Sequence, residues 1–536
     1  MTDITTPIGV EPRLSGVHTD HAAKARLRGR YAAEARFKWI GAGAVALSAL
    51  FLVLLLSTIV TQALPAFRMN YLTLPVDLSA AKVDPANPGA TNFAALAQDA
   101  LSAKFPGVES RQDRRLLRGL ISTGAGDILR RQIAEDPSLL GKTVDYPVPL
   151  DDFADLYLKG LIAEKSSDTA ITTTVAPSGT SGEIDVTFGD DSIARLARGY
   201  GATEENDVLR LTSGASSLLV LVDGGVVKLT EISAGAGDPT TAKGTVIKPL
   251  DGNAAAASGA ATLRVIDTPE SSRKISDKEI VWLDELKAQS LVESRFNTIF
   301  FFTGASREPE LAGIWGAVVG SFLTMIVTLG IAFPIGVSAA VYLEEFAAKN
   351  RLTTFIEVNI NNLAAVPSIV YGLLGLAVFL NFFGLPRSAP LVGGMVLALM
   401  TLPIIIIASR AALRAVPPSI REAALGVGAS KVQMVFHHVL PLAMPGIMTG
   451  TILGMAHALG ETAPLLMIGM VAFIVDIPGG FTDPATILPV QIFMWADFPE
   501  AGFQQKTSAA ILILLGFLVI MNAIAVILRK RFERRW

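Results

Sequence analysis

Long apolar segments separated by polar stretches set the pattern of this chain. Ile40–Val60 has no charged residue, and at about 1.5 Å per residue it can cross about 30 Å of hydrocarbon as a helix. Five further segments are also long and apolar: Leu311–Leu343, Asn359–Phe383, Ala389–Ser409, Pro445–Ile474 and Thr507–Leu528. The pattern predicts an α-helical integral membrane protein with six transmembrane helices.

Residues 66–305 interrupt this pattern, because they carry most of the charged residues and no segment that could cross a bilayer. We predict a soluble α+β insert between helices 1 and 2. Its predicted elements are helices at Ala94–Lys104, Arg111–Arg131 and Ser276–Ser294, and strands within Ile171–Phe188 and Val208–Ile247. Asp223-Gly224-Gly225 predicts a hairpin turn. The stretches near 233–244 and 252–262 are interpreted as flexible loops, and Asp151-Asp152 as a solvated turn.

Basic residues orient the spans. A basic segment, residues 1–38, precedes the first span (residues 39–65), and several basic residues follow the last one: Arg529, Lys530, Arg531, Arg534 and Arg535. By the positive-inside rule, both termini are expected in the cytoplasm and residues 66–305 outside it. Arg387, between the third and fourth spans, lies outside in this topology, against the rule. The first span starts too deep in the chain and is too long for a cleaved signal peptide, the competing interpretation.

The polar segment 410–441 separates the fourth and fifth spans. Two Ser-x-x-Glu/Gln patterns predict helix starts, Ser419 with Glu422 and Ser430 with Gln433. Prolines and glycines predict the helix ends and the turn between them: Pro417, Pro418, Gly426, Gly428 and Leu440-Pro441. Two short helices joined by a turn bury little surface of their own, so the segment is expected to bind a partner.

Glu461 is the only acidic residue that interrupts an apolar span, and the pattern places it well inside the fifth helix. A carboxylate there is unfavourable unless it faces a partner, protein or water. Pro464 leaves the carbonyl of Gly460 without its helical donor, which predicts a local opening. Glu461 is interpreted as a pathway or gating residue, or alternatively as a carboxyl that joins helices. His457, also a candidate translocation residue, lies on the same helix face four residues earlier, and the two alternatives for it are a contact with Glu461 and packing against a neighbouring helix.

A Pro-Ser break with two glycines opens the third span, in Val366-Pro367-Ser368-Ile369-Val370-Tyr371-Gly372. Irregular backbone at membrane depth is tolerated where it lines a cavity or is buried in protein. Pro367, Ser368 and Tyr371 are therefore candidate translocation residues. The alternative is that the glycines only allow close helix packing.

Composition excludes several kinds of chemistry. The chain has no cysteine, so disulfides and thiolate metal sites are excluded, and its five histidines lack metal-ligand spacing. No glycine-rich loop with Lys-Ser/Thr is present, so the chain has no P-loop of its own. We expect no catalytic site, no metal, no cofactor and no nucleic-acid partner. If ATP drives this protein, another chain binds it.

The segment 410–441 resembles the EAA loop of ABC importer permeases, in Glu422-Ala423-Ala424, Gly428 and Leu440-Pro441, although His438 replaces an aliphatic residue. The resemblance implies a MetI-like permease core and a cytoplasmic helix that docks on an ATPase subunit. The residues expected to couple the two subunits are Arg421, Glu422, Ala423, Ala424, Gly428, Ser430 and Lys431.

Two further motifs, Val366–Gly372 and Leu459–Leu466, narrow the resemblance to phosphate importer permeases of the PstA family, over about Ser306–Trp536. It implies a permease core at 306–536 in the bacterial inner membrane, with residues 66–305 in the periplasm. The implied partners are a PstB-like ATPase, a PstC-like second permease as heterodimer, a periplasmic PstS-like phosphate-binding protein and membrane lipid. Glu461 matches a glutamate of that family, whereas many relatives have arginine at the position of His457. The insert resembles the extra N-terminal region of some proteobacterial members.

Other functions stay open at the level of sequence. The loop at 410–441 does not distinguish phosphate from another oxyanion such as sulfate or molybdate, and it could also be an ordinary amphipathic connection. A membrane sensor or scaffold with an extracytoplasmic ligand domain is a third hypothesis. It predicts no dependence on an ATPase.

Overall fold

The computed structural model describes residues 21–79, 82–83, 91–162, 166–177, 183–189, 191–233, 240–249 and 257–532. The chain divides into two units, Met1–Thr61 and Gln62–Trp536. The described part of the first unit is helix α1 (His21–Ala63), whose last two residues belong to the second unit. The helix contains the predicted span Ile40–Val60, and an 18-residue stretch of it has a mean hydropathy of 2.5, which is apolar enough to cross a membrane.

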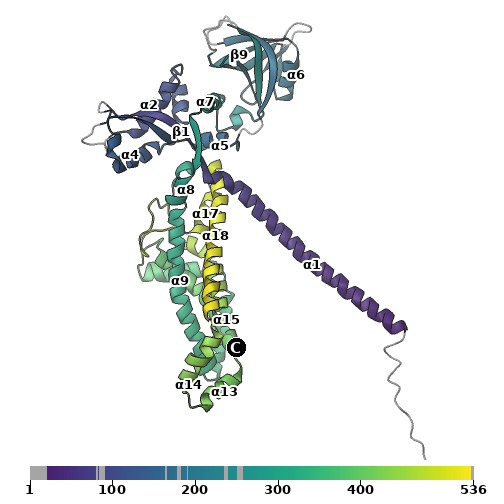
Figure 1. Ribbon diagram of the computed structural model, residues 1–536, viewed down its shortest axis with the longest axis vertical. Coiled ribbons are helices and arrows are strands. Elements are labelled where there is room, and N and C mark those ends of the chain that lie inside the picture. The colour runs from purple at the N-terminus through teal and green to yellow at the C-terminus, as the bar shows by residue number, and fades with distance from the viewer. Residues whose placement is uncertain are drawn as a thin grey trace, which may run out of the picture. The chain divides into compact units, whose positions relative to one another are not determined.

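The second unit begins with a sheet on which helices pack. Strand β1 (Arg68–Asp77) is the centre of a three-stranded antiparallel sheet of order β11-β1-β2, with β2 at Thr143–Pro149 and β11 at Val292–Phe296. The helices around it are α2 (Phe93–Lys104), α3 (Arg111–Arg118), α4 (Ala125–Glu135), α5 (Asp152–Leu158) and α7 (Asp277–Ala288). Arg68 pairs with Phe296, so the two ends of this part of the chain meet (Figure 1). We call residues 68–296 the insert.

A second sheet with a core of its own lies within the insert. Its strands are β3 (Ser166–Pro177), β4 (Glu183–Phe188), β5 (Thr203–Glu205), β6 (Val208–Arg210), β7 (Ser217–Val222), β8 (Gly225–Ser233), β9 (Thr240–Lys248) and β10 (Ala257–Ile266). The order is β5-β6-β8-β7-β10-β3-β4-β9, and an additional β8–β9 pairing closes six of them into a barrel. Helix α6 (Ser192–Gly199) contributes Ile193, Ala194 and Ala197 to the barrel core. Closure leaves these six strands without a free edge.

The predicted hairpin at Asp223-Gly224-Gly225 is confirmed. Val222 pairs with Gly225, and the two turn residues between them have positive φ, 41° at Asp223 and 72° at Gly224. Positive φ at both central residues defines the hairpin turn that matches the right-handed twist of the strands. Asp and Gly tolerate this conformation, so local sequence fixed the turn.

Other predictions for the insert were wrong in part. Arg111–Arg131 is two helices, because the chain turns at Gly119 and Gly124 between α3 and α4. The predicted loop 233–244 contains the start of β9, and 252–262 contains the start of β10, since barrel neighbours override their weak β propensity. Residues 234–239 and 250–256 lie outside the described residues. The predicted helix over Ser276–Ser294 ends at Ala288 and is followed by β11.

Four long helices cross the rest of the second unit: α9 (Trp315–Val341), α12 (Pro390–Ala415), α15 (Leu440–Gly460) and α18 (Ala501–Phe532). Glycines allow two of these helices, α9 and α12, to pack closely on each other. A Cβ on Gly394 would lie 2.4 Å from Val327, and one on Gly336 would lie 2.8 Å from Ile405. Both sequence positions advance together along the contact, so α9 and α12 run in the same direction. The fourth span is confirmed, and α9 continues through Pro334.

The parallel direction of α9 and α12 requires the chain between them to return across the membrane. That chain forms α10 (Arg351–Ala364) and α11 (Ser368–Gly375), which continues as a π-helix, η7 (Leu376–Phe382). The two arms are bent by 101°, so they form one broken span rather than a straight helix over Asn359–Phe383. With this span, the described residues hold six segments that could cross a membrane.

The fifth and sixth spans differ from prediction at their ends. Helix α15 ends at Gly460 rather than Ile474, and the chain continues through the short helix α16 (Ala463–Met467). An irregular stretch then leads to α17 (Leu488–Ala496), which packs on α9 and α18. Helix α18 begins at Ala501, six residues before the predicted span at Thr507, so the predicted loop residue Lys506 is a buried helical residue.

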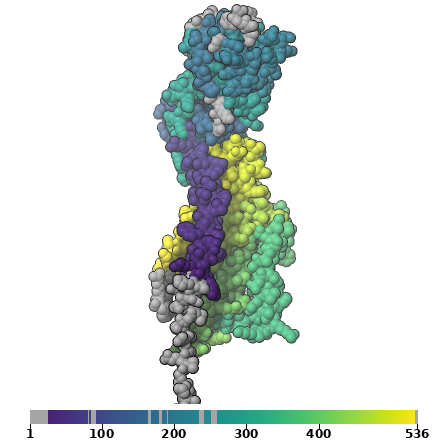
Figure 2. Space-filling view, turned by 90° about the vertical axis from the view of Figure 1, so that its right-hand side faces the viewer, coloured from purple at the N-terminus to yellow at the C-terminus, as the bar shows by residue number. Residues whose placement is uncertain are grey.

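The insert and the segment 410–441 lie at opposite ends of the long helices. The start of α18 contacts α5 of the insert, and the N–H of Gly502 donates to Asp152 Oδ2 at 3.2 Å. Figure 2 shows this yellow start of α18 directly below the blue insert. The short helices α13 and α14 lie at the far end of α9 and α18 (Figure 1).

Candidate functional site

The segment 410–441 folds as a short helix, a turn and a second helix start. Helix α13 (Pro418–Gly426) follows the end of α12, and Gly428 has a φ of +90°, which glycine adopts without strain. Ser430 and Gln433 form the predicted capping box: the N–H of Gln433 donates to Ser430 Oγ at 3.3 Å, and the N–H of Ser430 donates to Gln433 Oε1 at 2.9 Å. This box starts α14 (Lys431–Gln433).

Two local predictions for this segment were wrong. Pro417 is the N-cap of α13, so Ser419 lies inside the first turn and forms no capping box with Glu422. Leu440-Pro441 does not end the second helix, because α14 continues through the π-helical η8 (Met434–Val439) into α15. Pro441 falls in the first turn of α15, where the missing N–H is tolerated next to the π-helical register change.

Large apolar side chains are exposed along α13, the following turn, α14 and η8. Four large ones are exposed: Leu425, Val427, Val432 and Phe436. Val427 is 85% exposed at the tip of the loop. Among the predicted coupling residues, Glu422, Ala423, Gly428, Ser430 and Lys431 are also exposed. Clustered apolar exposure of this kind is typical of a surface that binds a partner protein.

The two other predicted coupling residues face inward. Ala424 is buried against the apolar cluster of α12 and α15. Arg421 is bound within the segment, to Glu345 and to the carbonyls of Leu413 and Val416. Its guanidinium is therefore occupied inside the chain rather than presented to a partner.

Glu461 lies at the end of α15, not well inside the fifth helix as predicted. It is the C-cap residue with an extended backbone (φ −83°, ψ 128°), because Pro464 cannot supply the donor that would continue the helix. Of the two alternatives for His457, the contact with Glu461 is present, with His457 Nε2 3.3 Å from Glu461 Oε1. His457 is half exposed and Glu461 is partly buried, so the pair is reachable from outside the helices of this chain.

A hydrogen bond from Tyr371 stabilises the break in the third span. Pro367 is the N-cap of α11, and Ser368 starts the helix. The hydroxyl of Tyr371 donates to the carbonyl of Leu363 at 2.7 Å, which satisfies a carbonyl at the end of α10 across the bend. A specific hydrogen bond thus stabilises the sharp turn between the two arms.

The two predicted pathway segments contact each other. Helix α11 packs on α16, and a Cβ on Gly372 would lie 2.7 Å from the Cα and carbonyl oxygen of Pro464. Gly372 therefore allows the two backbones to approach closely. The break at 365–367 and the break at 461–462 belong to one region of the fold, and we take this region as the candidate translocation site.

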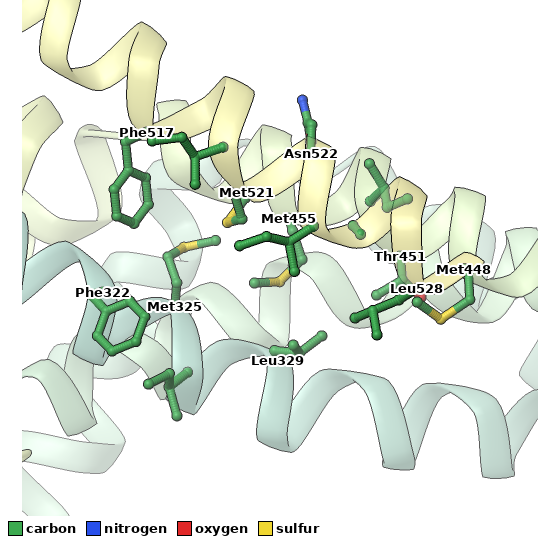
Figure 3. Close-up of a pocket in the computed structure, with 15 residues that line it drawn as sticks. Phe322, Met325, Leu329, Met448, Thr451, Met455, Phe517, Met521, Asn522 and Leu528 are labelled. Carbon is green, nitrogen blue, oxygen red and sulfur yellow. The ribbon is translucent and has the colours of Figure 1, made fainter. Parts of the chain in front are cut away.

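A separate cavity of about 290 Å³ lies between α9, α15 and α18. Figure 3 shows methionine and phenylalanine side chains around it, including Met325, Met455 and Phe517, with Thr451 and Asn522 as its polar residues. None of the predicted site residues lines it. An apolar lining cannot compensate the charge of an anion, so this cavity is not the candidate translocation site.

A buried polar junction between the insert and the helices was not predicted. Asp152, interpreted from sequence as a solvated turn residue, is buried against Gly502 in α18. Burial raises the pKa of Asp152 to about 7, that of Asp151 to about 6 and that of Glu310 to about 7. Only the fold brings residues so far apart in sequence together, and no local pattern marks them.

The described residues contain no group of three or more His, Asp or Glu side chains that could hold a metal ion. The arrangement consists of an exposed apolar loop at one end of the helices and a doubly broken region within them. The loop can bind a partner protein, and the broken region can change its conformation between the helices.

Comparison with known proteins extends this description. Residues 332–536 match the family described as binding-protein-dependent transport system inner membrane component, and residues 24–168 match a domain of unknown function (DUF3333). The phosphate transport system permease protein PstA 1 of Mycobacterium tuberculosis (strain CDC 1551 / Oshkosh) is 33% identical over 235 residues, 43% of this chain and 76% of that protein. PstC of Haemophilus influenzae is 32% identical over 232 residues, 38% of this chain and 72% of that protein. An inward-facing MetNI methionine ABC transporter structure covers 41% of this chain and 95% of that chain, at 18% identity and a TM-score of 0.33.

Proposed function

Because the chain belongs to the PstA family of phosphate transport system permeases, we propose that it is the transmembrane subunit of an ATP-driven importer of inorganic phosphate. The observation that carries the proposal is the 33% identity to PstA 1, which extends over 76% of that protein. The exposed apolar loop at 418–436 supports coupling to an ATPase, since it offers a partner protein a binding surface at one end of the helices.

The partners follow from what this chain lacks and exposes. The sequence has no P-loop, so ATP binds to a separate PstB-like subunit that docks on α13 and the following turn. A PstC-like second permease covers the broken span, whose arms expose large apolar side chains: Leu352, Phe355, Val358, Leu363, Ile369 and Leu373. A PstS-like binding protein delivers phosphate at the end of the helices that carries the insert. In this proposal the insert is periplasmic and both termini are cytoplasmic.

Glu461 acts as a gate or as an orienting partner, not as a ligand of phosphate. A carboxylate repels a phosphate dianion, which is met instead by hydrogen-bond donors and helix dipoles. His457, when protonated, supplies the positive charge next to Glu461. Closure of the ATPase moves α13, and the contact between α11 and α16 shifts to open the passage to one side or the other.

The test is uptake of labelled phosphate into proteoliposomes that contain the chain with its ATPase, second permease and binding protein. We expect uptake that depends on ATP and that excess unlabelled phosphate abolishes. Competition by sulfate or molybdate instead would assign the importer to another oxyanion. Absence of an ATPase from the purified complex would favour a sensor or scaffold.

In the same assay we expect Glu461→Gln to lower uptake by about tenfold or more, because the pair with His457 is lost at the break, while assembly is unchanged. Glu500→Gln, which removes an acidic residue next to the start of α18, is the matched control and should transport normally. Normal uptake by Glu461→Gln would remove this residue from the mechanism.

A further inference from the structure

Four elements are joined by charged side chains at the end of the helices that carries the 410–441 segment. Glu344 and Glu345 lie in the π-helical turn η6 (Tyr342–Phe346) that ends α9. Glu344 pairs with two arginines of α12 and Glu345 with one of α13, while Glu357 of α10 pairs with the same α12 through Arg410. We call the six residues the ionic joint: Glu344, Glu345, Glu357, Arg410, Arg414 and Arg421.

Arg421 has the most complete set of contacts in the joint. Its Nη2 donates to Glu345 Oε1 at 2.7 Å and to the carbonyl of Leu413 at 2.8 Å. Its Nη1 donates to the carbonyl of Val416 at 2.7 Å, and its Nε lies 3.2 Å from Glu345 Oε1. The planar fork of a guanidinium permits these simultaneous bonds, which a lysine ammonium could not reproduce.

These contacts span the junction between α12 and α13. Helix α12 ends at Ala415, α13 begins at Pro418, and Arg421 reaches back from α13 to carbonyls on the α12 side. The same guanidinium binds the end of α9 through Glu345, whose side chain is only 6% exposed. Loss of Arg421 would leave a buried carboxylate and two carbonyls without these donors, which is strongly unfavourable.

The neighbouring pairs fix the rest of the joint. Arg410, buried in α12, lies 2.6 Å from Glu357 of α10 and 3.5 Å from Glu344 of α9. Arg414, one turn further along α12, donates to Glu344 at 2.8 Å. The ends of α9, α10 and α12 are thereby held together, and Arg421 attaches α13 to them.

We propose that Arg421 and Glu345 form a positioning pair that makes α13 move with the ends of α9 and α12. Through this pair, closure of the ATPase moves the transmembrane helices. The inference rests on the proposed function, because it assigns the pair a task within that importer. Arg421 does not contact the ATPase or the transported anion in this assignment. It acts through α13.

The test measures phosphate taken up per ATP hydrolysed by the reconstituted importer. We expect Arg421→Gln and the isosteric Glu345→Gln to keep the ATPase bound and hydrolysing, but to transport about tenfold less phosphate per ATP, since a buried charge pair is broken. Arg421→Lys should give an intermediate ratio, because it keeps the charge and loses the fork. Full rescue by lysine would contradict the positioning role. So would an unchanged ratio in both glutamine variants.

Arg351→Gln is the matched control, because Arg351 is exposed at the start of α10 and has no ion pair among the described residues. It should keep the wild-type ratio. Loss of ATPase binding in Arg421→Gln, with binding retained in Glu345→Gln, would overturn the proposal, since Arg421 would then contact the ATPase directly.

A second measurement separates this inference from the proposed function. Spin labels on Val427→Cys and Tyr342→Cys, both exposed, report the distance between the tip of the loop and the end of α9 in a chain without native cysteines. One narrow distance with and without ATP is expected, and a broad distribution in Arg421→Gln. Equal distance distributions in the wild type and in Arg421→Gln would contradict the positioning role of the pair. Absent phosphate uptake by the wild type would instead contradict the proposed function.

Discussion

Glu310 illustrates how a single residue acquires its properties from the fold. It precedes the second span, and its side chain is only 4% exposed at the junction between the insert and the helices. The hydroxyl of Ser122 donates to Glu310 Oε1 at 2.6 Å, while Oε2 has no hydrogen-bond partner among the residues that the structure describes. Desolvation dominates and raises the pKa of Glu310 from 4.5 to about 7.

This pKa predicts that stability falls as pH rises. Below about pH 4.5 Glu310 is protonated in the folded and the unfolded chain, and between 4.5 and 7 only the folded chain keeps the proton. Stability therefore falls progressively between about pH 4.5 and pH 7, by up to about 3 kcal/mol in all, and this contribution is constant at higher pH. Glu310→Gln keeps the acceptor for Ser122 and cannot ionise, so it should melt several degrees higher than the wild type at pH 8 and at nearly the same temperature at pH 4.5.

Thermal unfolding of the purified protein in detergent at the two pH values checks this prediction. Glu109→Gln, which removes an exposed carboxyl of the insert, is the control and should follow the wild type at both. An equal gain for Glu310→Gln at both pH values would show that ionisation of this carboxyl is not the cause.

At the scale of elements, the contact between α11 and α16 depends on Gly372. The backbone of Pro464 occupies the space where a Cβ would lie, so a side chain must push the two helix breaks apart. Gly372→Ala is expected to lower phosphate uptake by about tenfold while the complex still assembles, because small displacements at a site have effects of this order or larger.

Gly330 offers a matched control for this substitution. It lies in α9, and nothing lies within 4 Å of the position of its Cβ. Gly330→Ala should therefore transport like the wild type and gain slightly in helix propensity. If Gly372→Ala also transports normally, the close approach of α11 and α16 has no part in the passage of phosphate.

At the scale of the whole molecule, we predict that the insert and the loop at 418–436 lie on opposite sides of the membrane. A chain without native cysteines allows single ones to be placed at Glu205→Cys in the insert and Val427→Cys in the loop, both exposed. A membrane-impermeant maleimide added to intact cells should label the first at once and the second only after the membrane is opened. Labelling of Val427→Cys in intact cells would contradict the topology on which the importer depends.

The sequence by itself determined features that act over a few residues or one helix length. Apolar length set the existence of the membrane segments, Asp223-Gly224 set the hairpin, and Ser430 with Gln433 set the start of α14. The EAA motif and the family resemblance also lie in short runs of sequence. The family and the candidate segments are therefore encoded in local stretches of the chain.

Only the tertiary structure decided which of these segments meet and which residues are buried. It brought Gly372 against Pro464, bound Arg421 to Glu345, and buried Asp152 under the start of α18. The reason is physical. Local rules fix backbone conformation and periodicity, whereas burial, pKa shifts and ion pairs depend on neighbours far away in sequence, which only packing brings close.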